Sequence, residues 1–224
     1  MVNNFHIRAP KAQSARRSLA AGVLRLLHFT RCPCCQSLAD TPLLGLCDVC
    51  DKIIEKQRLN TRLTCICCAL PLQNSAITAV GDTLDARLYC GQCLVKRPKF
   101  QRCVAATRYS PPIAKLVNNL KHQGRLSAIK VMAREMHLAL ANQNTGGIDW
   151  LVPVPIHPSR LLSRGFNQSL ELTKILSTEL QIPFTRTLCA RQHKATAQQS
   201  LNREKRAKNL LHAFTFSKRV DGLR

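Results

Sequence analysis

Twelve cysteines carry the clearest chemistry in this 224-residue sequence. Eight of them form four C-x-x-C pairs: Cys32 with Cys35, Cys47 with Cys50, Cys65 with Cys68 and Cys90 with Cys93. Two sulfurs separated by two residues can both turn inward from one tight turn, and two such turns supply the four thiolates of a tetrahedral zinc site. The spacing therefore predicts two closed, structural zinc sites with no coordination position left for water.

The sequence leaves the pairing of these four turns open. Pairing in sequence order, first with second and third with fourth, is the simplest topology, and a crossed arrangement is the alternative. Redox pairs or buried free thiols also produce C-x-x-C, but one redox pair suffices for that chemistry and four are present. Cys34 and Cys67 each adjoin a predicted ligand, and we interpret them as packing or spare thiols.

A secreted disulfide framework is the competing explanation for so many cysteines, and it requires an export signal. The N-terminal region has basic residues followed by an apolar run over 19–29, but Arg25 interrupts the run and no small-residue cleavage site follows. No stretch reaches the ~18–20 apolar residues of a membrane span. We therefore predict a cytoplasmic protein that is not integral to the membrane, with residues 18–29 as a short amphipathic helix.

The elements that must position these residues divide the chain in two. Proline and glycine interrupt the short apolar runs of the first ~95 residues, so metal rather than a large core is expected to hold this part. From Phe100 onward the pattern is typical of an α/β fold with a parallel sheet. Strands are predicted at 103–109, 149–155 and 182–188, and helices after Pro111-Pro112 and over 126–140, 167–180 and 207–214. The predicted domains are a basic helix at 1–30, a double zinc ribbon at 31–97 and an α/β domain at 98–224.

The charge of the chain indicates its class of partner. Lys and Arg number 34 against 12 Asp and Glu, a formal net charge of +22, and the surplus is largest in residues 101–224. Such a charge favours contact with a polyanion, whether nucleic acid, a phosphorylated metabolite or an acidic membrane surface. Aromatic residues make up only 4%, which argues against a broad base-stacking platform.

A basic loop is the first candidate for binding that polyanion. The predicted strand ending at Pro155 leads to Arg160, Arg164 and Gly165, and open α/β sheets bind ligands at such carboxyl edges. Gly165 permits close backbone approach, and the start of the next helix favours an anion. The alternative is that the two arginines, four residues apart, form a solvated helical face. Lys121 is a further candidate phosphate contact.

A second basic cluster extends from Arg191 to Asn209 and includes Arg206. Its alternative interpretation is again a solvated, basic helix surface. Charge alone does not decide between the two.

Four pieces of sequence together resemble the ComF family of competence proteins, over residues 32–216. The C-x-x-C turns are the first, and Leu120-Lys121 with Gly124 is the second. VPVP followed by R-x-x-x-R-G-F-N-Q, at Arg160 to Gln168, is the third and most specific. The fourth is T-x-Q-x-x-L-x-x-x-x-R-x-x-N-x-x-x-A-F, from Thr196 to Phe214.

The resemblance implies a double zinc ribbon followed by a type I phosphoribosyltransferase-like parallel sheet. It also implies a role in handling imported single-stranded DNA during natural transformation and in growth on external DNA. The partners implied are single-stranded DNA or a phosphoribosyl ligand, and DNA-uptake machinery at the inner face of the membrane. The candidate phosphate-binding residues are then Lys121, Arg160, Arg164, Gly165, Asn167, Gln168 and Arg206.

One departure from the family pattern concerns catalysis. Family members continue into a strand, a pair of aspartates and a T-T-G loop that holds a 5-phosphate and helps to position Mg²⁺. This sequence stops at Val220 to Arg224 and has no two adjacent acidic residues. We therefore expect an incomplete family member that does not catalyse the transfer, with Mg²⁺ bound only where that loop is present. The alternatives are a phosphoribosyltransferase of nucleotide salvage and a zinc-dependent adaptor without a ligand of its own.

Overall fold

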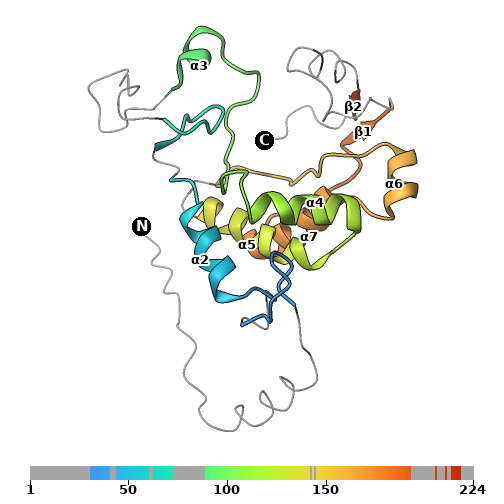
Figure 1. The fold of residues 1–224 in the computed structure, drawn as a ribbon. Helices are drawn as coiled ribbons and strands as arrows, with labels where there is room; N and C mark the ends of the chain where they lie inside the picture. Colours follow the sequence, from blue (N-terminus) through green and yellow to red (C-terminus); the bar gives the residue numbers. More distant parts are fainter. Residues whose placement is uncertain are drawn as a thin grey trace, which may run out of the picture.

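The computed structural model describes residues 31–40, 44–60, 63–72, 89–141, 143, 145–192, 205, 210 and 213–217. Its elements are α2 (Asp48–Lys56), α3 (Gly91–Val95), α4 (Ile113–Gln123), α5 (Ser127–Ala141), α6 (Pro158–Arg164), α7 (Gln168–Leu180), β1 (Cys189–Arg191) and β2 (Phe214–Phe216). Helices α2, α4, α5 and α7 gather centrally, with α3 set apart from them (Figure 1). The predicted helix over 18–29 lies outside the described residues.

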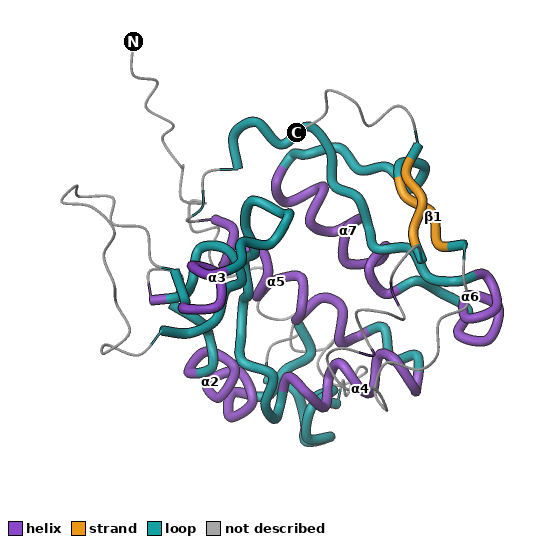
Figure 2. The backbone as a smooth tube through the Cα atoms, turned by 90° about the horizontal axis from the view of Figure 1, so that it is seen from above, coloured by secondary structure: helices purple, strands orange, loops and turns teal. Residues whose placement is uncertain are grey.

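Helices α4, α5 and α7 confirm the helices predicted after Pro111-Pro112 and over 126–140 and 167–180. Helix α5 contacts both α4 and α7, and Figure 2 shows it between them. Leu116 and Leu120 of α4, one turn apart, are buried together with Ala128 and Val131 of α5. Helix α4 ends at Gly124, whose φ of 63° is the left-handed conformation that glycine adopts readily at a helix terminus. Helices α4, α5 and α7 form the helical body of the protein. Burial of their apolar faces is its main stabilising contribution.

The first cysteine-rich segment belongs to the same hydrophobic core as these helices. Leu46 and Ile54, which flank the second cysteine pair, lie in one buried cluster with residues of α4 and α5. The buried Asn119 of α4 also donates a hydrogen bond from Nδ2 to the carbonyl oxygen of Pro33, at 3.2 Å. Helix α4 is therefore fixed directly to the first C-x-x-C turn. The predicted domain bounds, 1–30, 31–97 and 98–224, stay a prediction.

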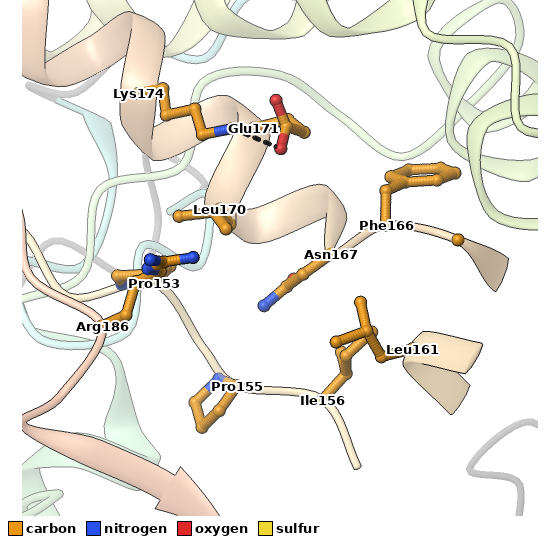
Figure 3. Close-up of a pocket in the computed structure, with 11 residues that line it drawn as sticks. Pro153, Pro155, Ile156, Leu161, Phe166, Asn167, Leu170, Glu171, Lys174 and Arg186 are labelled. Atoms are coloured by element: carbon orange, nitrogen blue, oxygen red, sulfur yellow. Dashed lines mark hydrogen bonds and ion pairs between the residues drawn. The ribbon is translucent and has the colours of Figure 1, made fainter. Parts of the chain in front are cut away.

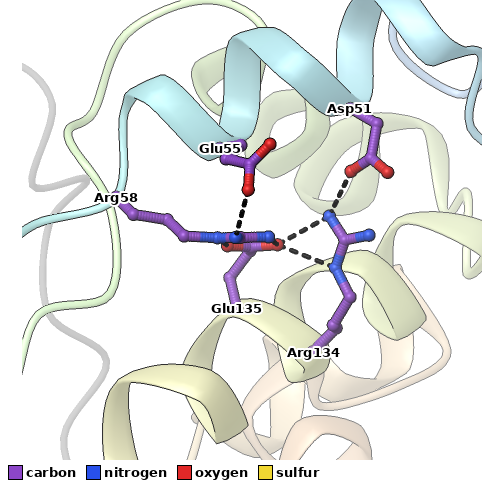
Figure 4. A network of polar contacts seen from close by, with 5 residues as sticks. All are labelled: Asp51, Glu55, Arg58, Arg134 and Glu135. Carbon is purple, nitrogen blue, oxygen red and sulfur yellow. Dashed lines mark hydrogen bonds and ion pairs between the residues drawn. The ribbon is translucent and has the colours of Figure 1, made fainter.

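A polar network joins α2 to α5 beside this core (Figure 4). Arg134 of α5 pairs through Nη2 with Oδ1 of Asp51 on α2 at 2.6 Å. The neighbouring Glu135 is buried and pairs with Arg58, which follows α2, at 2.7 Å from Nε to Oε2. A buried carboxylate is tolerated only when it is paired. The network thus couples the orientation of α2 to that of α5.

The predicted parallel sheet is not seen in the residues that the structure describes. Leu151, in the predicted strand 149–155, forms one isolated parallel bridge with Phe184, in the predicted strand 182–188. Neither segment forms a longer strand. Pro153 and Pro155 have no N–H with which to extend the ladder. Val152 and Val154, expected to be buried, are 41% and 58% exposed. Both strand predictions were therefore wrong. The segments are apolar, but their prolines at 153, 155 and 183 interrupt the hydrogen bonding that a strand needs.

Two further segments, around Thr107 and around Phe214, also differ from the prediction. Thr107, in the predicted strand 103–109, forms an isolated antiparallel bridge with Arg58 and so connects to the end of α2. Phe214, predicted on the last helix, instead lies in β2, which pairs antiparallel with β1 through Arg191 and Phe214. The sequence Phe-Thr-Phe is aromatic and β-branched and favours a strand. Most of the rest of the predicted last helix lies outside the described residues.

Candidate metal centres and ligand pocket

The first candidate metal centre consists of Cys32, Cys35, Cys47 and Cys50, whose sulfurs all lie within 4.8 Å of one another. The Sγ atoms of Cys35 and Cys47 are 3.5 Å apart. A tetrahedral zinc with Zn–S bonds of about 2.3 Å places its sulfurs ~3.8 Å apart. The cluster therefore has the donor type, number and spacing of a structural zinc site.

The second candidate metal centre repeats this construction with Cys65, Cys68, Cys90 and Cys93. Sγ of Cys68 lies 3.6 Å from Sγ of Cys90. In each centre the first pair lies in a tight turn, and the second pair begins a helix: Cys47 caps α2 and Cys90 caps α3. The two clusters confirm pairing in sequence order and are consistent with two zinc sites. Bound zinc would hold each pair of turns together without contributing reaction chemistry.

The eight cluster thiols lie in different local environments. Burial raises the pKa of Cys47, Cys50, Cys68 and Cys93. Hydrogen bonds from Ser37 lower the pKa of Cys35 to about 6. Burial acts to raise the pKa of Cys65, but backbone hydrogen bonds to its sulfur prevail and bring it to about 6. The thiolate form is the one that binds metal. Burial also raises the pKa of Cys34 to about 12, so the shift alone does not distinguish Cys34 from the ligand thiols. Cys34 and Cys67 are both buried and lie outside the two four-sulfur clusters, in keeping with packing roles.

A pocket of about 380 Å³ lies where the R-G-F-N-Q segment meets the chain at 153–156 (Figure 3). His157 caps the start of α6, and α6 ends at Gly165 with a φ of 81°. Asn167 then begins α7, accepting at Oδ1 the N–H of Ser169 at 3.0 Å. Its Nδ2 donates to the carbonyl oxygen of Val154 at 3.1 Å. Asn167 therefore holds α7 against the 153–156 segment and fixes the pocket wall.

The structure brings some of the predicted phosphate-binding residues together and leaves others apart. Gly165 and Asn167 line the pocket. Of the other described candidates, Lys121, Arg160, Arg164 and Gln168 lie outside its lining, and Arg206 is outside the described residues.

Two of the sequence motifs nevertheless lie next to each other. A Cβ atom placed on Gly124 would stand 3.8 Å from Cε1 of Phe166, so the end of α4, four residues after Leu120, packs against the R-G-F-N-Q segment. Within that segment, Arg164 donates from Nη1 to Oε1 of Gln168 at 2.8 Å. The R-G-F-N-Q segment is therefore held in place by contacts with α4 and by its own side-chain hydrogen bond.

Three charged lining residues were not predicted from the sequence. Glu171 and Lys174 of α7 form an ion pair at 2.8 Å, and Arg186 lies beside Pro153 in the pocket lining (Figure 3). The i, i+4 spacing of Leu170 and Lys174, following Asn167, is the signal that places one face of α7 toward the pocket. Arg186 had no comparable signal, because its position depends on the bridge between Leu151 and Phe184.

The chain thus combines two tetracysteine clusters consistent with zinc sites and a pocket lined by Gly165, Asn167 and basic side chains. The chain is 30% identical over 182 residues to DNA utilization protein YhgH of Escherichia coli K12, covering 80% of this chain and 74% of that protein. Against its Salmonella typhimurium counterpart it is 31% identical over 183 residues, with the same coverage. Against competence protein F of Haemophilus influenzae it is 27% identical over 191 residues, or 84% and 76% of the two chains. The chain therefore belongs to the ComF/YhgH family of competence and DNA utilization proteins.

No family model and no solved structure matches this chain. Within the described part, no helix has both the length and the apolar character to cross a membrane. The family assignment therefore depends on the curated relatives and on the agreement of the cysteine clusters with the resemblance.

Proposed function

We propose that this protein handles single-stranded DNA in the reducing cytoplasm, next to the machinery that brings DNA across the inner membrane. Two names support this proposal: the relatives are a DNA utilization protein and a competence protein. The net charge of +22 supports it as well, because a polyanionic strand binds a basic protein by releasing counterions. Zinc at both cysteine clusters is the cofactor that we propose, and its role is structural.

The pocket beside Gly165 is the observation that carries the ligand part of the proposal. Its walls combine a glycine that allows close backbone approach with two cationic side chains, Lys174 and Arg186. Glu171 neutralises part of this charge through its ion pair with Lys174. Arg186 is exposed at the pocket and supplies a planar guanidinium that suits phosphate oxygens. We infer that the pocket takes a phosphate group of a nucleotide or of a phosphoribosyl ligand.

Catalysis of phosphoribosyl transfer is no part of the proposal. Neutralising a phosphate explains binding, whereas transfer also requires groups that hold the ribose and the metal. The sequence-based expectation that the chain is an incomplete family member stays a prediction. Binding and turnover are therefore measured separately.

The test is fluorescence anisotropy of a labelled oligothymidylate with the full chain, at several salt concentrations, with and without phosphoribosyl pyrophosphate. We expect affinity to fall steeply with salt, with a slope of ~0.7 for each phosphate contact. The double variant K174Q/R186Q should bind phosphoribosyl pyrophosphate about tenfold more weakly. The control R108Q/K130Q removes the same two charges from other exposed positions. Equal phosphoribosyl pyrophosphate affinities for the two double variants would contradict the pocket assignment.

Absence of binding to both ligands would favour a zinc-dependent adaptor. Measurable turnover of phosphoribosyl pyrophosphate would favour the salvage enzyme instead. These outcomes separate the three functions that the sequence left open.

A further inference from the structure

A second hollow, of about 790 Å³, lies directly against the second cysteine cluster. Two metal-ligating cysteines, Cys68 and Cys93, form part of its wall. The remainder comes from α3 and the segment that follows it, including Lys96, Lys99 and Phe100. Figure 1 shows α3 standing away from α4, α5 and α7, so this hollow is remote from the helical core.

The two cysteine modules differ sharply in charge. The described residues of the first module, 31–40 and 44–58, include Asp40, Asp48, Asp51 and Glu55 against four basic side chains. The described residues of the second module, 63–72 and 89–102, include no acidic side chain and four basic ones: Lys96, Arg97, Lys99 and Arg102. The first module uses its acidic groups to pair with α5, as Asp51 does with Arg134. Among the described residues of the second module, the charged side chains are all positive.

Aromatic and apolar side chains lie among these cations. Phe100 is 53% exposed beside Lys99, and Val95 is almost fully exposed next to Lys96. The guanidinium of Arg97 lies over the ring of Tyr89, 5.0 Å from its centroid. This cation–π contact orients the guanidinium plane. Exposed rings next to cations are the combination that single-stranded nucleic acid uses, because every base has a face that stacks and every linkage has a negative phosphate.

We propose that the hollow beside the second cysteine cluster is a docking surface for single-stranded nucleic acid. Phosphates contact Lys96 and Lys99, and Phe100 stacks on a base. The surface is small, which agrees with an aromatic content too low for a broad stacking platform. This proposal rests on the proposed function and adds a second contact region, separate from the pocket beside Gly165. The first cysteine module then supports the core while the second carries the ligand surface.

One structural role competes with this assignment. A zinc ion held by four thiolates carries a net charge of about −2, which nearby cations stabilise. The four basic side chains among the described residues of the second module exceed that charge, whereas the described residues of the first module surround an equivalent cluster with as many acidic as basic side chains. Neutralisation of the cluster therefore does not account for the basic surface.

The experiment compares K96Q/K99Q, F100A and the control K52Q/K56Q, all as full chains with bound zinc quantified. Lys52 and Lys56 are exposed on α2 of the first module and provide the matched loss of two charges. K96Q/K99Q should lower the salt slope for oligothymidylate by about 1–2 and weaken binding at least tenfold. F100A should weaken binding about tenfold without changing the slope. K52Q/K56Q should bind within about twofold of the parent.

The outcomes separate this surface from the pocket. Retained binding of phosphoribosyl pyrophosphate by K96Q/K99Q, with loss of oligothymidylate binding, supports the surface. Parental oligothymidylate affinity in both K96Q/K99Q and F100A overturns the surface and leaves the pocket proposal intact. Loss of zinc in K96Q/K99Q would assign the lysines to the cysteine cluster and overturn the proposal. Polyglutamate has negative charge but no bases to stack, so competition as strong as that of unlabelled oligothymidylate would also overturn it. Absence of oligothymidylate binding in the parent overturns the docking surface and the proposed handling of single-stranded DNA, whereas phosphoribosyl pyrophosphate binding decides the pocket assignment.

Discussion

Glu135 on α5 accepts two hydrogen bonds from Arg58, the residue that connects the end of α2 to the rest of the chain. Nε of Arg58 lies 2.7 Å from Oε2, and Nη2 lies 3.3 Å from Oε1. The Glu135 side chain is only 2% exposed and also accepts from Nε of Arg134 at 2.8 Å. The buried carboxylate of Glu135 therefore links the first cysteine module, through Arg58, to α5 of the helical body.

The substitution Glu135→Gln should lower the free energy of unfolding by about 3 kcal/mol, because it leaves two guanidinium groups beside a neutral amide. This value is at the lower end of the usual range because both arginines remain partly exposed. Urea unfolding followed by circular dichroism measures the change. Glu179→Gln is the control, since Glu179 is exposed on α7. Equal midpoints for the two variants would show that the network contributes little to stability.

Loss of metal should affect the two cysteine modules differently. Cys47 lies in the same buried cluster as Leu116 and Leu120 of α4, whereas Cys90 lies in a separate small cluster with the cysteines of its own module. Cys47→Ser should therefore halve the bound zinc and also lower the unfolding midpoint of the helical body, because structural zinc binding contributes folding free energy.

Cys90→Ser is the matched variant, and it should halve the bound zinc while leaving the helical transition near its original midpoint. Zinc quantification and far-ultraviolet circular dichroism on the same samples test this difference. Equal loss of helical stability in both variants would contradict it.

The sequence predicted local features well and long-range pairing poorly, for physical reasons. C-x-x-C spacing fixes which sulfurs face one another within a turn, and the periodicity of Ile129 and Ala133 reports a buried helix face directly. Leu126, in the same predicted series, lies before α5 and is 53% exposed. Strand pairing depends instead on partners far along the chain. Nothing local shows that Thr107 pairs with Arg58 or that Leu151 forms its bridge with Phe184, whereas Pro153 and Pro155 were a local signal against a longer strand. The position of Arg186 at the pocket follows from that same bridge and was missed with it.

Thiol reactivity should follow burial and metal binding. Cys103 is exposed and lies outside both clusters, so it should react first with N-ethylmaleimide. Cys34 should stay unmodified, because burial raises its pKa to about 12 and keeps the thiol protonated at neutral pH, while the thiolate is the nucleophile. Addition of a strong chelator should expose the cluster cysteines to labelling. Peptide mass spectrometry resolves the order, and early modification of Cys34 with zinc bound would contradict the structure.

Gly165 should be required for its backbone conformation more than for the space around it. Its φ is 81°, and a Cβ atom added there meets nothing within 4 Å, so Gly165→Ala introduces conformational strain without a clash. An L-residue in this region costs ~1–2 kcal/mol. Gly91→Ala is the control, because Gly91 also has open space around it but opens α3 without a positive φ. Urea unfolding should show the loss of stability for Gly165→Ala alone.

Gly165→Ala should also bind phosphoribosyl pyrophosphate more weakly, since relief of the strain moves the turn between α6 and α7 that forms one pocket wall. Unchanged stability together with unchanged binding would show that this turn accepts another geometry, and that the glycine in R-G-F-N-Q serves a purpose other than the left-handed end of α6.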